Sequence, residues 1–280
     1  MTSKILKIAL IGRTNAGKST LINSIVGEKI SIQNKKINTT QVTIMGVKNI
    51  KKTQLIFYDT PGSNFLKSLN KQSKNLKTNL WSGIDESDII FYLIDSKTAN
   101  IKFLFEQIEK LQEVKKKIIV IFNKIDLISN KQLLPLISNL NKNFHIDSFF
   151  TISAIQNIGI DDLLDYVKKY SYVSKWIFED DEITNKDDIF IVGELLRETM
   201  LTYLHKEIPY NVSIQTSNFK ILKNKDIKIK QKIIINQKRY KKIILGRKGE
   251  MIKKIREDSQ KKMSQILNAK IHLYLEILNA

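Results

Sequence analysis

Residues 12–19 read Gly12-Arg13-Thr14-Asn15-Ala16-Gly17-Lys18-Ser19, and this stretch decides how the first half of the chain folds. It fits the pattern G-x-x-x-x-G-K-[ST] and lies between an apolar run at 5–11 and a helical pattern at 18–26. Glycines let the backbone curl around a phosphate, so that successive N–H groups and the helix N-terminus face the anion. Lys18 is expected to reach the β- and γ-phosphates, and the Ser19 hydroxyl is expected to bind Mg²⁺. The stretch and the adjoining Thr20 therefore predict a nucleotide site.

Apolar runs alternate with helical patterns around this loop. Strands are expected at 5–11, 42–47, 54–58, 89–94, 117–121 and 146–150, and helices at 18–26, 101–114, 131–141 and 160–170. Apolar strands interleaved with helices favour an α/β domain with a mostly parallel sheet covered on both faces. The acidic run 179–182 has few apolar neighbours and is typical of a linker. We therefore expect a first domain at 1–174 and a linker at 175–186.

The remaining residues, 187–280, have a different pattern. An amphipathic helix is expected at 187–206, and Pro209 stops it. Strands at 210–215 and 227–235, a short helix, a Gly-x-x-Gly turn, a helix at 250–267 and a strand at 270–277 follow. This order predicts a second, α+β domain.

The tetrapeptide Asn123-Lys124-Ile125-Asp126 follows the expected strand 117–121. The Asp126 carboxylate can accept two hydrogen bonds from the N1–H and 2-amino groups of guanine, which adenine lacks, so the motif favours GTP over ATP. The stem of Lys124 is expected to lie over the base. Ser153 and Ala154, after the next strand, can offer a backbone N–H to guanine O6.

A further motif, Asp59-Thr60-Pro61-Gly62, follows the expected strand 54–58. Asp59 stands where a second Mg²⁺-supporting carboxylate is needed, and the Gly62 N–H can bond the γ-phosphate. In the preceding loop, the Thr40 hydroxyl can close over Mg²⁺ and the γ-phosphate when GTP is bound, as an order–disorder switch. Lys18, Thr40 and Gly62 are thus the groups expected to act on the γ-phosphate.

Composition narrows the class of protein. The chain has no cysteine, which excludes disulfide scaffolds and thiol catalysis and fits a reducing cytoplasm. We expect no signal peptide, because the chain enters the apolar run at 5–11 almost directly, and no stretch approaches the roughly 20 apolar residues of a membrane span. The net charge is +19, and residues 220–270 carry 18 Lys and Arg against 4 Asp and Glu. Such a block fits a phosphate-rich partner and, equally, the solvated surface of a Lys-rich protein.

The turn Gly246-Arg247-Lys248-Gly249 joins the short helix to the helix at 250–267. A lone G-x-x-G is a plain turn. Here the surrounding order of helices and strands resembles a type II KH domain, in which the loop lets a nucleic-acid backbone approach closely. Arg247 and Lys248 would supply charge to phosphates, and Lys241, Lys242 and Lys253 would add to the same surface.

Taken together, the motifs resemble those of the Era family of GTPases. The resemblance lies in GRTNAGKST at 12–20, NTTQ at 38–41, DTPG at 59–62, NKID at 123–126 and SAI at 153–155, and it continues through VGELLRETMLTYLHKEIPYNV at 192–212 to GRKGEMIKKI at 246–255. It implies GTP hydrolysis with Mg²⁺, binding near the 3′ end of 16S rRNA, and a role in 30S subunit assembly. It also implies a cytoplasmic protein with some peripheral contact with the inner membrane, which we expect to be a monomer. Asn15 matches potassium-stimulated relatives, which implies K⁺ beside the phosphates.

Two departures from the family pattern leave alternatives open. Gln41 stands where the family usually has Arg, and Ser63 stands where a large apolar residue is usual. Ser63 is too short to orient the attacking water as a Gln does in other GTPases. The first alternative is therefore an RNA-binding assembly factor that binds nucleotide but hardly turns it over. The second is a tRNA-modification GTPase, whose members carry other appended domains and a C-terminal Cys that this chain lacks.

Overall fold

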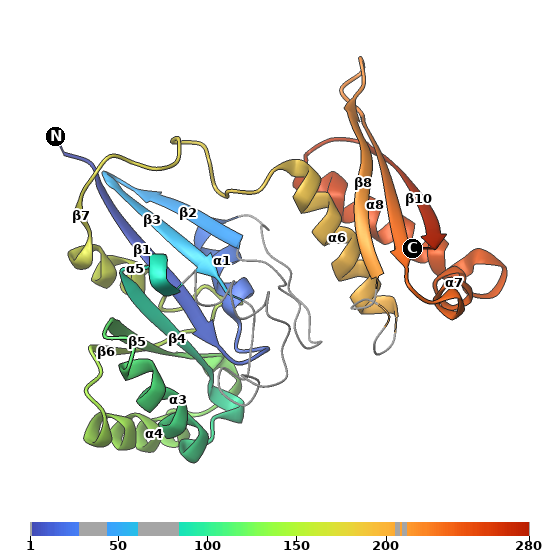
Figure 1. Cartoon of the computed structure of the whole chain (residues 1–280). Coiled ribbons are helices and arrows are strands. Elements are labelled where there is room, and N and C mark those ends of the chain that lie inside the picture. Colours follow the sequence, from blue (N-terminus) through green and yellow to red (C-terminus); the bar gives the residue numbers. More distant parts are fainter. Residues whose placement is uncertain (1, 28–43, 61–83, 205–207, 209–211, 280) are drawn as a thin grey trace. The chain divides into compact units, whose positions relative to one another are not determined.

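The computed structural model describes residues 2–27, 44–60, 84–204, 208 and 212–279. It divides the chain into two compact units, Met1–Asn185 and Lys186–Ala280. Each is shown in Figure 1 and is described by itself.

A mostly parallel sheet organises the first unit. The main strands are β1 (Lys4–Gly12), β2 (Ile44–Ile50), β3 (Thr53–Asp59), β4 (Ile89–Asp95), β5 (Lys117–Asn123) and β6 (Ser148–Thr151), in the order β2-β3-β1-β4-β5-β6. β1, β3, β4, β5 and β6 run parallel to one another, whereas β2 runs antiparallel to β3. Because parallel strands end at one edge, the residues that follow β1, β3 and β5 meet there.

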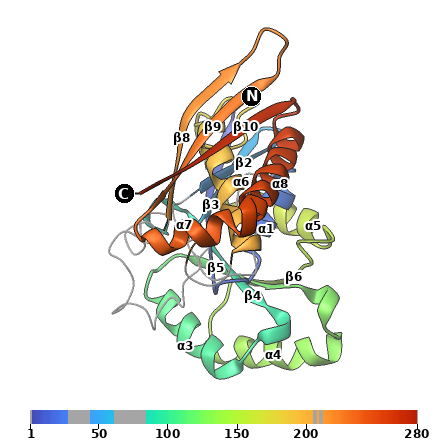
Figure 2. The same ribbon diagram turned by 90° about the vertical axis from the view of Figure 1, so that its right-hand side faces the viewer.

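Helices cover this sheet as the pattern predicts. They are α1 (Lys18–Val26), α3 (Ile101–Gln112), α4 (Asn130–Asn143) and α5 (Ile160–Val167). Leu104, Ile108 and Leu111 of α3 pack with Leu133 and Leu140 of α4 against buried residues of β1, β4 and β5. In Figure 2, α3 and α4 lie on one side of strands β4 to β6 and α5 lies on the other. A short strand missed by the pattern, β7 (Tyr172–Val173), pairs antiparallel with the start of β1.

The segment predicted to be a linker, residues 175–186, has contacts with the first unit. Residues up to Asn185 cluster with the first unit, and the segment lies along β2. Val47 N donates to Ile183 O at 2.8 Å, and Gly46 forms an antiparallel bridge with Thr184. The edge strand β2 has backbone groups that need partners, and this segment supplies them. The segment is thus held to the first unit and is no free tether over this length.

In its described residues, the second unit has three α-helices against one face of a three-stranded sheet. Its elements are α6 (Asp188–Tyr203), β8 (Val212–Ile221), β9 (Ile227–Ile235), α7 (Lys238–Leu245), α8 (Glu250–Ile266) and β10 (Ile271–Asn279). The sheet order is β10-β9-β8, with β9 parallel to β10 and antiparallel to β8. Buried residues of α6, α7 and α8 form one apolar core with alternate residues of β9 and β10. Within the described ranges, no helix combines the length and apolar character that crossing a bilayer requires.

Candidate nucleotide and nucleic-acid sites

Lys18 lies at the centre of the loop between β1 and α1. Its ammonium donates to Gly12 O at 2.9 Å and to Arg13 O at 3.1 Å, and the residue is only 6% exposed. Burial lowers the pKa of Lys18 from 10.5 to about 8, and the charge of Asp59 partly opposes this shift. Lys18 therefore remains protonated near neutral pH, and its positive charge lies at the loop predicted to hold phosphates.

The two described members of the predicted magnesium site touch each other. Ser19 Oγ donates to Asp59 Oδ2 at 2.7 Å, although the residues come from α1 and from the end of β3. Asp59 is completely buried. A hydroxyl and a carboxylate oxygen at the mouth of a phosphate loop are the hard donors that Mg²⁺ prefers, so these residues fit the ion.

Asn123, at the end of β5, joins the predicted base and phosphate regions. Its Nδ2 donates to Ala16 O at 2.9 Å, and its Oδ1 accepts from Lys124 N at 2.8 Å and from Ala154 N at 3.0 Å. Gly17 has φ +99°, and a Cβ there would lie 2.1 Å from Asn123 Nδ2. The loop glycine is therefore required by this close approach as well as by its backbone conformation.

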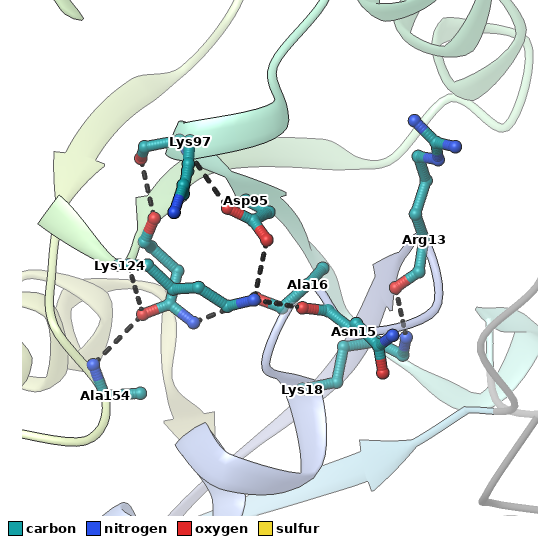
Figure 3. A network of polar contacts seen from close by, with 10 residues as sticks. Arg13, Asn15, Ala16, Lys18, Asp95, Lys97, Lys124 and Ala154 are labelled. Carbon is teal, nitrogen blue, oxygen red and sulfur yellow. Dashed lines mark hydrogen bonds and ion pairs between the residues drawn. The ribbon is translucent and has the colours of Figure 1, made fainter. Parts of the chain in front are cut away.

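Lys124 extends back to the phosphate loop, as Figure 3 shows. Its ammonium donates to Asn15 O and to Asp95 Oδ2, both at 2.6 Å. Sequence reasoning missed Asp95, although it ends β4 at the same edge of the sheet. It also missed Ser96, whose hydroxyl donates to Asn123 O at 2.6 Å. Strand-end position, the signal used for Asp59 and Asp126, would have found both residues.

Ser153 positions the predicted guanine-reading carboxylate, because its hydroxyl donates to Asp126 Oδ1 at 2.5 Å. Asp126 itself is exposed. The backbone N–H groups of Ser153 and Ala154 donate to Ile158 O and to Asn123 Oδ1. A bond from Ala154 N to guanine O6 would thus be shared with Asn123, a point that the sequence does not reveal.

Some of the other predicted nucleotide residues lie within the described residues, and the rest lie outside them. Thr60 is fully buried, and its hydroxyl donates to Leu10 O at 2.5 Å, which ties β3 to β1. The guanidinium of Arg13 lies 4.6 Å from the ring centroid of Phe103, on α3. Thr40, Pro61 and Gly62 lie outside the described residues, as do Gln41 and Ser63.

The predicted RNA loop lies between α7 and α8 of the second unit. Gly246 has φ +70°, and a Cβ there would lie 2.6 Å from Met251 Cβ, whereas Gly249, with φ +82°, has nothing within 4 Å of the same position. Both glycines therefore need their backbone freedom, but a side chain at Gly249 would point into open space. The five basic residues predicted for this surface are exposed: Lys241, Lys242, Arg247, Lys248 and Lys253.

Comparison with known proteins shows the family. Residues 7–124 match the model for 50S ribosome-binding GTPases, and residues 207–279 match the model for KH domains. The chain is 36% identical to GTPase Era of Rickettsia conorii over 272 residues, which is 97% of this chain and 79% of that one. It is 35% identical to GTPase Era of Agrobacterium fabrum over 96% of this chain and 84% of that one. The chain belongs to the Era family of GTPases.

Solved structures of Era proteins agree with this over both units. Era in complex with MgGDPNP and nucleotides 1506–1542 of 16S ribosomal RNA matches with a TM-score of 0.89 and 28% identity, covering 99% of this chain and 94% of that one. A single-residue variant of Aquifex aeolicus Era bound to GDP.AlF4⁻ matches with a TM-score of 0.88, also at 28% identity, covering 100% and 94% of the two chains. The fold class predicted from the sequence, a P-loop GTPase domain followed by a KH domain, is confirmed.

Proposed function

We propose that this Era-family GTPase binds 16S rRNA near its 3′ end through the second unit and acts in 30S subunit assembly, with GTP hydrolysis in the first unit setting its state. One observation supports this proposal above all. The chain combines a GTPase site whose predicted base and phosphate regions are joined by hydrogen bonds with a Gly-x-x-Gly loop that carries exposed basic residues. The support for 16S rRNA is the similar Era structure, which contains nucleotides 1506–1542.

The residues suggest how the first unit acts on GTP. Lys18 supplies a positive charge that is already desolvated and aimed by two carbonyls, so that little reorganisation is needed when negative charge develops on the phosphates. Ser19 and Asp59 would hold Mg²⁺, which neutralises phosphate charge when bound. Asn123 and Lys124 fix the phosphate loop relative to Asp126, so base recognition and phosphate position are coupled.

Potassium is the remaining cofactor proposal. Asn15 has a positive φ of 65° and lies on the loop beside the predicted phosphate position, where a monovalent cation could offset developing charge. We expect hydrolysis to be several-fold faster in KCl than in NaCl at equal ionic strength, and the difference to vanish in Asn15→Ala. Equal rates in the two salts would show that Asn15 only shapes the loop.

Two variants, one in each unit, test the proposed function. Gly249→Asp should lower affinity for an RNA of nucleotides 1533–1542 of 16S rRNA at least tenfold, because it places a negative charge in open space on the expected RNA path, while leaving GTP affinity unchanged. Lys18→Ala should remove hydrolysis and leave RNA binding to the GTP-free protein unchanged. RNA binding is measured by fluorescence anisotropy and hydrolysis by phosphate release. RNA binding at the parent level in Gly249→Asp would overturn the assignment of the loop.

The low-turnover alternative has its own test. Phosphate release by the parent is measured alone and with purified small ribosomal subunits. A rate that stays near background in both, with intact GTP binding, would favour the binding factor over the switch.

A further inference from the structure

The second unit has an open sheet face that the predicted Gly-x-x-Gly loop does not use. Along β9, Ile227, Ile229, Ile233 and Ile235 are buried in the core beneath the three helices, and Gln231 is also buried. Side chains alternate between the two faces of a strand. Lys228, Lys230 and Lys232 are therefore on the face opposite the helices, in a row that extends about 13 Å along the strand.

Neighbouring strands add to this basic row. Lys220 of β8 is paired directly with Lys228, and Tyr274 of β10 is paired with Lys230. Tyr274 is 53% exposed, and Lys228 Nζ lies 5.5 Å from its ring centroid. We call Lys220, Lys228, Lys230, Lys232 and Tyr274 the open-face cluster.

The acidic residues near the open-face cluster do not neutralise it. Asp226 Oδ2 lies 2.8 Å from His272 Nε2, and this contact lowers the pKa of the Asp226 carboxyl. Glu276, paired with Lys232, is the acidic residue that shares the face. Among the described residues of this sheet, four ammonium groups thus share the face with one further carboxylate, that of Glu276.

This arrangement does not help the fold. Like charges placed directly opposite each other on a sheet destabilise it, and Lys220 of the edge strand β8 forms such a pair with Lys228 of the central strand β9. A solvated strand face needs polar residues, but it does not need lysine at three successive outward positions. A polyanion would relieve the repulsion and would release counterions on binding.

We propose that the open-face cluster is a second RNA-binding surface, which holds the sugar–phosphate backbone of a segment other than the one at Gly246–Gly249. The proposal rests on the RNA-binding function proposed above. The lysine row matches a phosphate backbone in charge, and the exposed Tyr274 ring offers an unpaired base a stacking platform. An anionic membrane is the less suitable partner, because Tyr274 is the large apolar side chain exposed within the cluster and such a surface needs several to insert. A longer RNA would engage both surfaces, and a short one only the loop.

The test compares two RNAs on the full chain. The long probe is nucleotides 1506–1542 of 16S rRNA, and the short probe is nucleotides 1533–1542. The test variant changes Lys228, Lys230 and Lys232 to Gln, and the matched control changes the exposed Lys102, Lys110 and Lys131 of the first unit to Gln. Binding is measured by anisotropy at several salt concentrations. Thermal melting checks the fold, and we expect the test variant to melt no lower than the parent because it relieves repulsion.

The salt dependence carries the result. Loss of three phosphate contacts should weaken long-probe binding about a hundredfold at 0.1 M salt, and should make the slope of log K against log salt shallower by about 2. Binding of the short probe should change no more than it does in the control. If the test variant binds the long probe as the control does, the open-face proposal is wrong, while RNA binding at the loop stands.

Two further outcomes separate the proposals. If Gly249→Asp binds the short probe like the parent, the proposed function fails instead. If vesicles of phosphatidylglycerol bind the parent but not the test variant, and both RNAs bind the variant normally, the cluster belongs to lipid headgroups and the open-face proposal is overturned.

Discussion

At the scale of single residues, Lys18 shows a balance between desolvation and charge. Burial of the Lys18 ammonium carries an unfavourable desolvation free energy. The hydrogen bonds to two carbonyls and the negative charge of Asp59 offset part of it. The residue is therefore held ready for a phosphate at the expense of stability. A buried ammonium of this kind should make the free energy of unfolding depend on pH.

The first prediction concerns this dependence of the free energy of unfolding on pH. The pKa of Lys18 is about 8 in the folded chain against 10.5 ordinarily, so the unfolded chain binds more protons between these values. The free energy of unfolding contributed by Lys18 should then rise by about 3 kcal/mol as pH increases from 8 to 10.5. Lys18→Met should lack this rise and be more stable than the parent at pH 7. Urea unfolding of both proteins from pH 7 to 10 measures it, and parallel profiles would contradict it.

The second prediction concerns base choice. Asp126→Asn should lower GTP affinity by a factor of about 10⁴ and create affinity for xanthosine triphosphate, because the donor and acceptor pattern inverts. Ser153→Ala should weaken GTP binding less, by about tenfold, because it frees the Asp126 carboxylate from the 2.5 Å bond without removing it. Calorimetry with both nucleotides checks this. Unchanged GTP affinity in Asp126→Asn would end the guanine assignment.

At the scale of elements, Gln54 of β3 holds the segment that follows β7. The side chain is completely buried, its Oε1 accepts from the N–H groups of Ile177 and Phe178, and its Nε2 donates to Phe178 O. Nothing in the local sequence marks Gln54 as such a clamp. Its role depends on a segment more than 120 residues away, which pattern reasoning does not bring into contact.

The third prediction removes that clamp. Gln54→Leu should leave two partly buried N–H groups without this acceptor and lower the free energy of unfolding of the first unit by about 1–3 kcal/mol. Gln112→Leu, which loses an exposed bond to His145 O, should cost less than about 0.5 kcal/mol. Urea unfolding is followed for the transition that shifts when GDP is added, since that transition belongs to the nucleotide-binding unit. Equal stability of the two variants would contradict the role of Gln54.

The fourth prediction compares two glycines beside α1. Gly17 and Gly27 both have positive φ, +99° and +88°, but only at Gly17 would a Cβ collide with another residue, Asn123. Gly17→Ala should therefore lower GTP affinity at least a hundredfold, while Gly27→Ala should keep it within threefold, because both carry a similar backbone cost and only Gly17 disturbs the site. Nucleotide titration decides between them, and equal losses would show that φ alone matters.

Sequence reasoning succeeded where a pattern is local. The helix Lys18–Val26 and the strand Ile227–Ile235 begin and end where the pattern predicts. Pattern reasoning failed where a strand depends on a distant partner. It missed β7, a strand of two residues that pairs with β1, and it ended β8 at residue 215, whereas the strand extends six residues further to Ile221. For the nucleotide site, the motif positions predict Lys18, Ser19, Asp59, Asn123 and Asp126. Asp95 and Ser96 belong to no motif: their position at the end of β4 is the only sequence signal for them, and the structure shows their contacts with the Asn123-Lys124 pair.

At the scale of the whole molecule, the chain combines two units whose chemistries can be changed separately. The GTPase unit carries its buried contacts at one edge of a parallel sheet, and the KH unit exposes its basic groups on its surface. Variants at Lys18 and Gly249 should therefore each remove one activity. We propose that the two units act on one RNA: the second unit binds it, and GTP hydrolysis in the first unit sets the state of the protein.

Crosslinking in cell extract, followed by sequencing of the recovered RNA, tests that claim most directly. With GTP present, reads from the parent should concentrate at the 3′ end of 16S rRNA, and Gly249→Asp should lose that peak while still binding GTP. Lys18→Ala, which should keep RNA binding and lose GTP hydrolysis, serves as the folded control. Reads spread over all RNAs in proportion to abundance, or an unchanged peak in Gly249→Asp, would contradict the account.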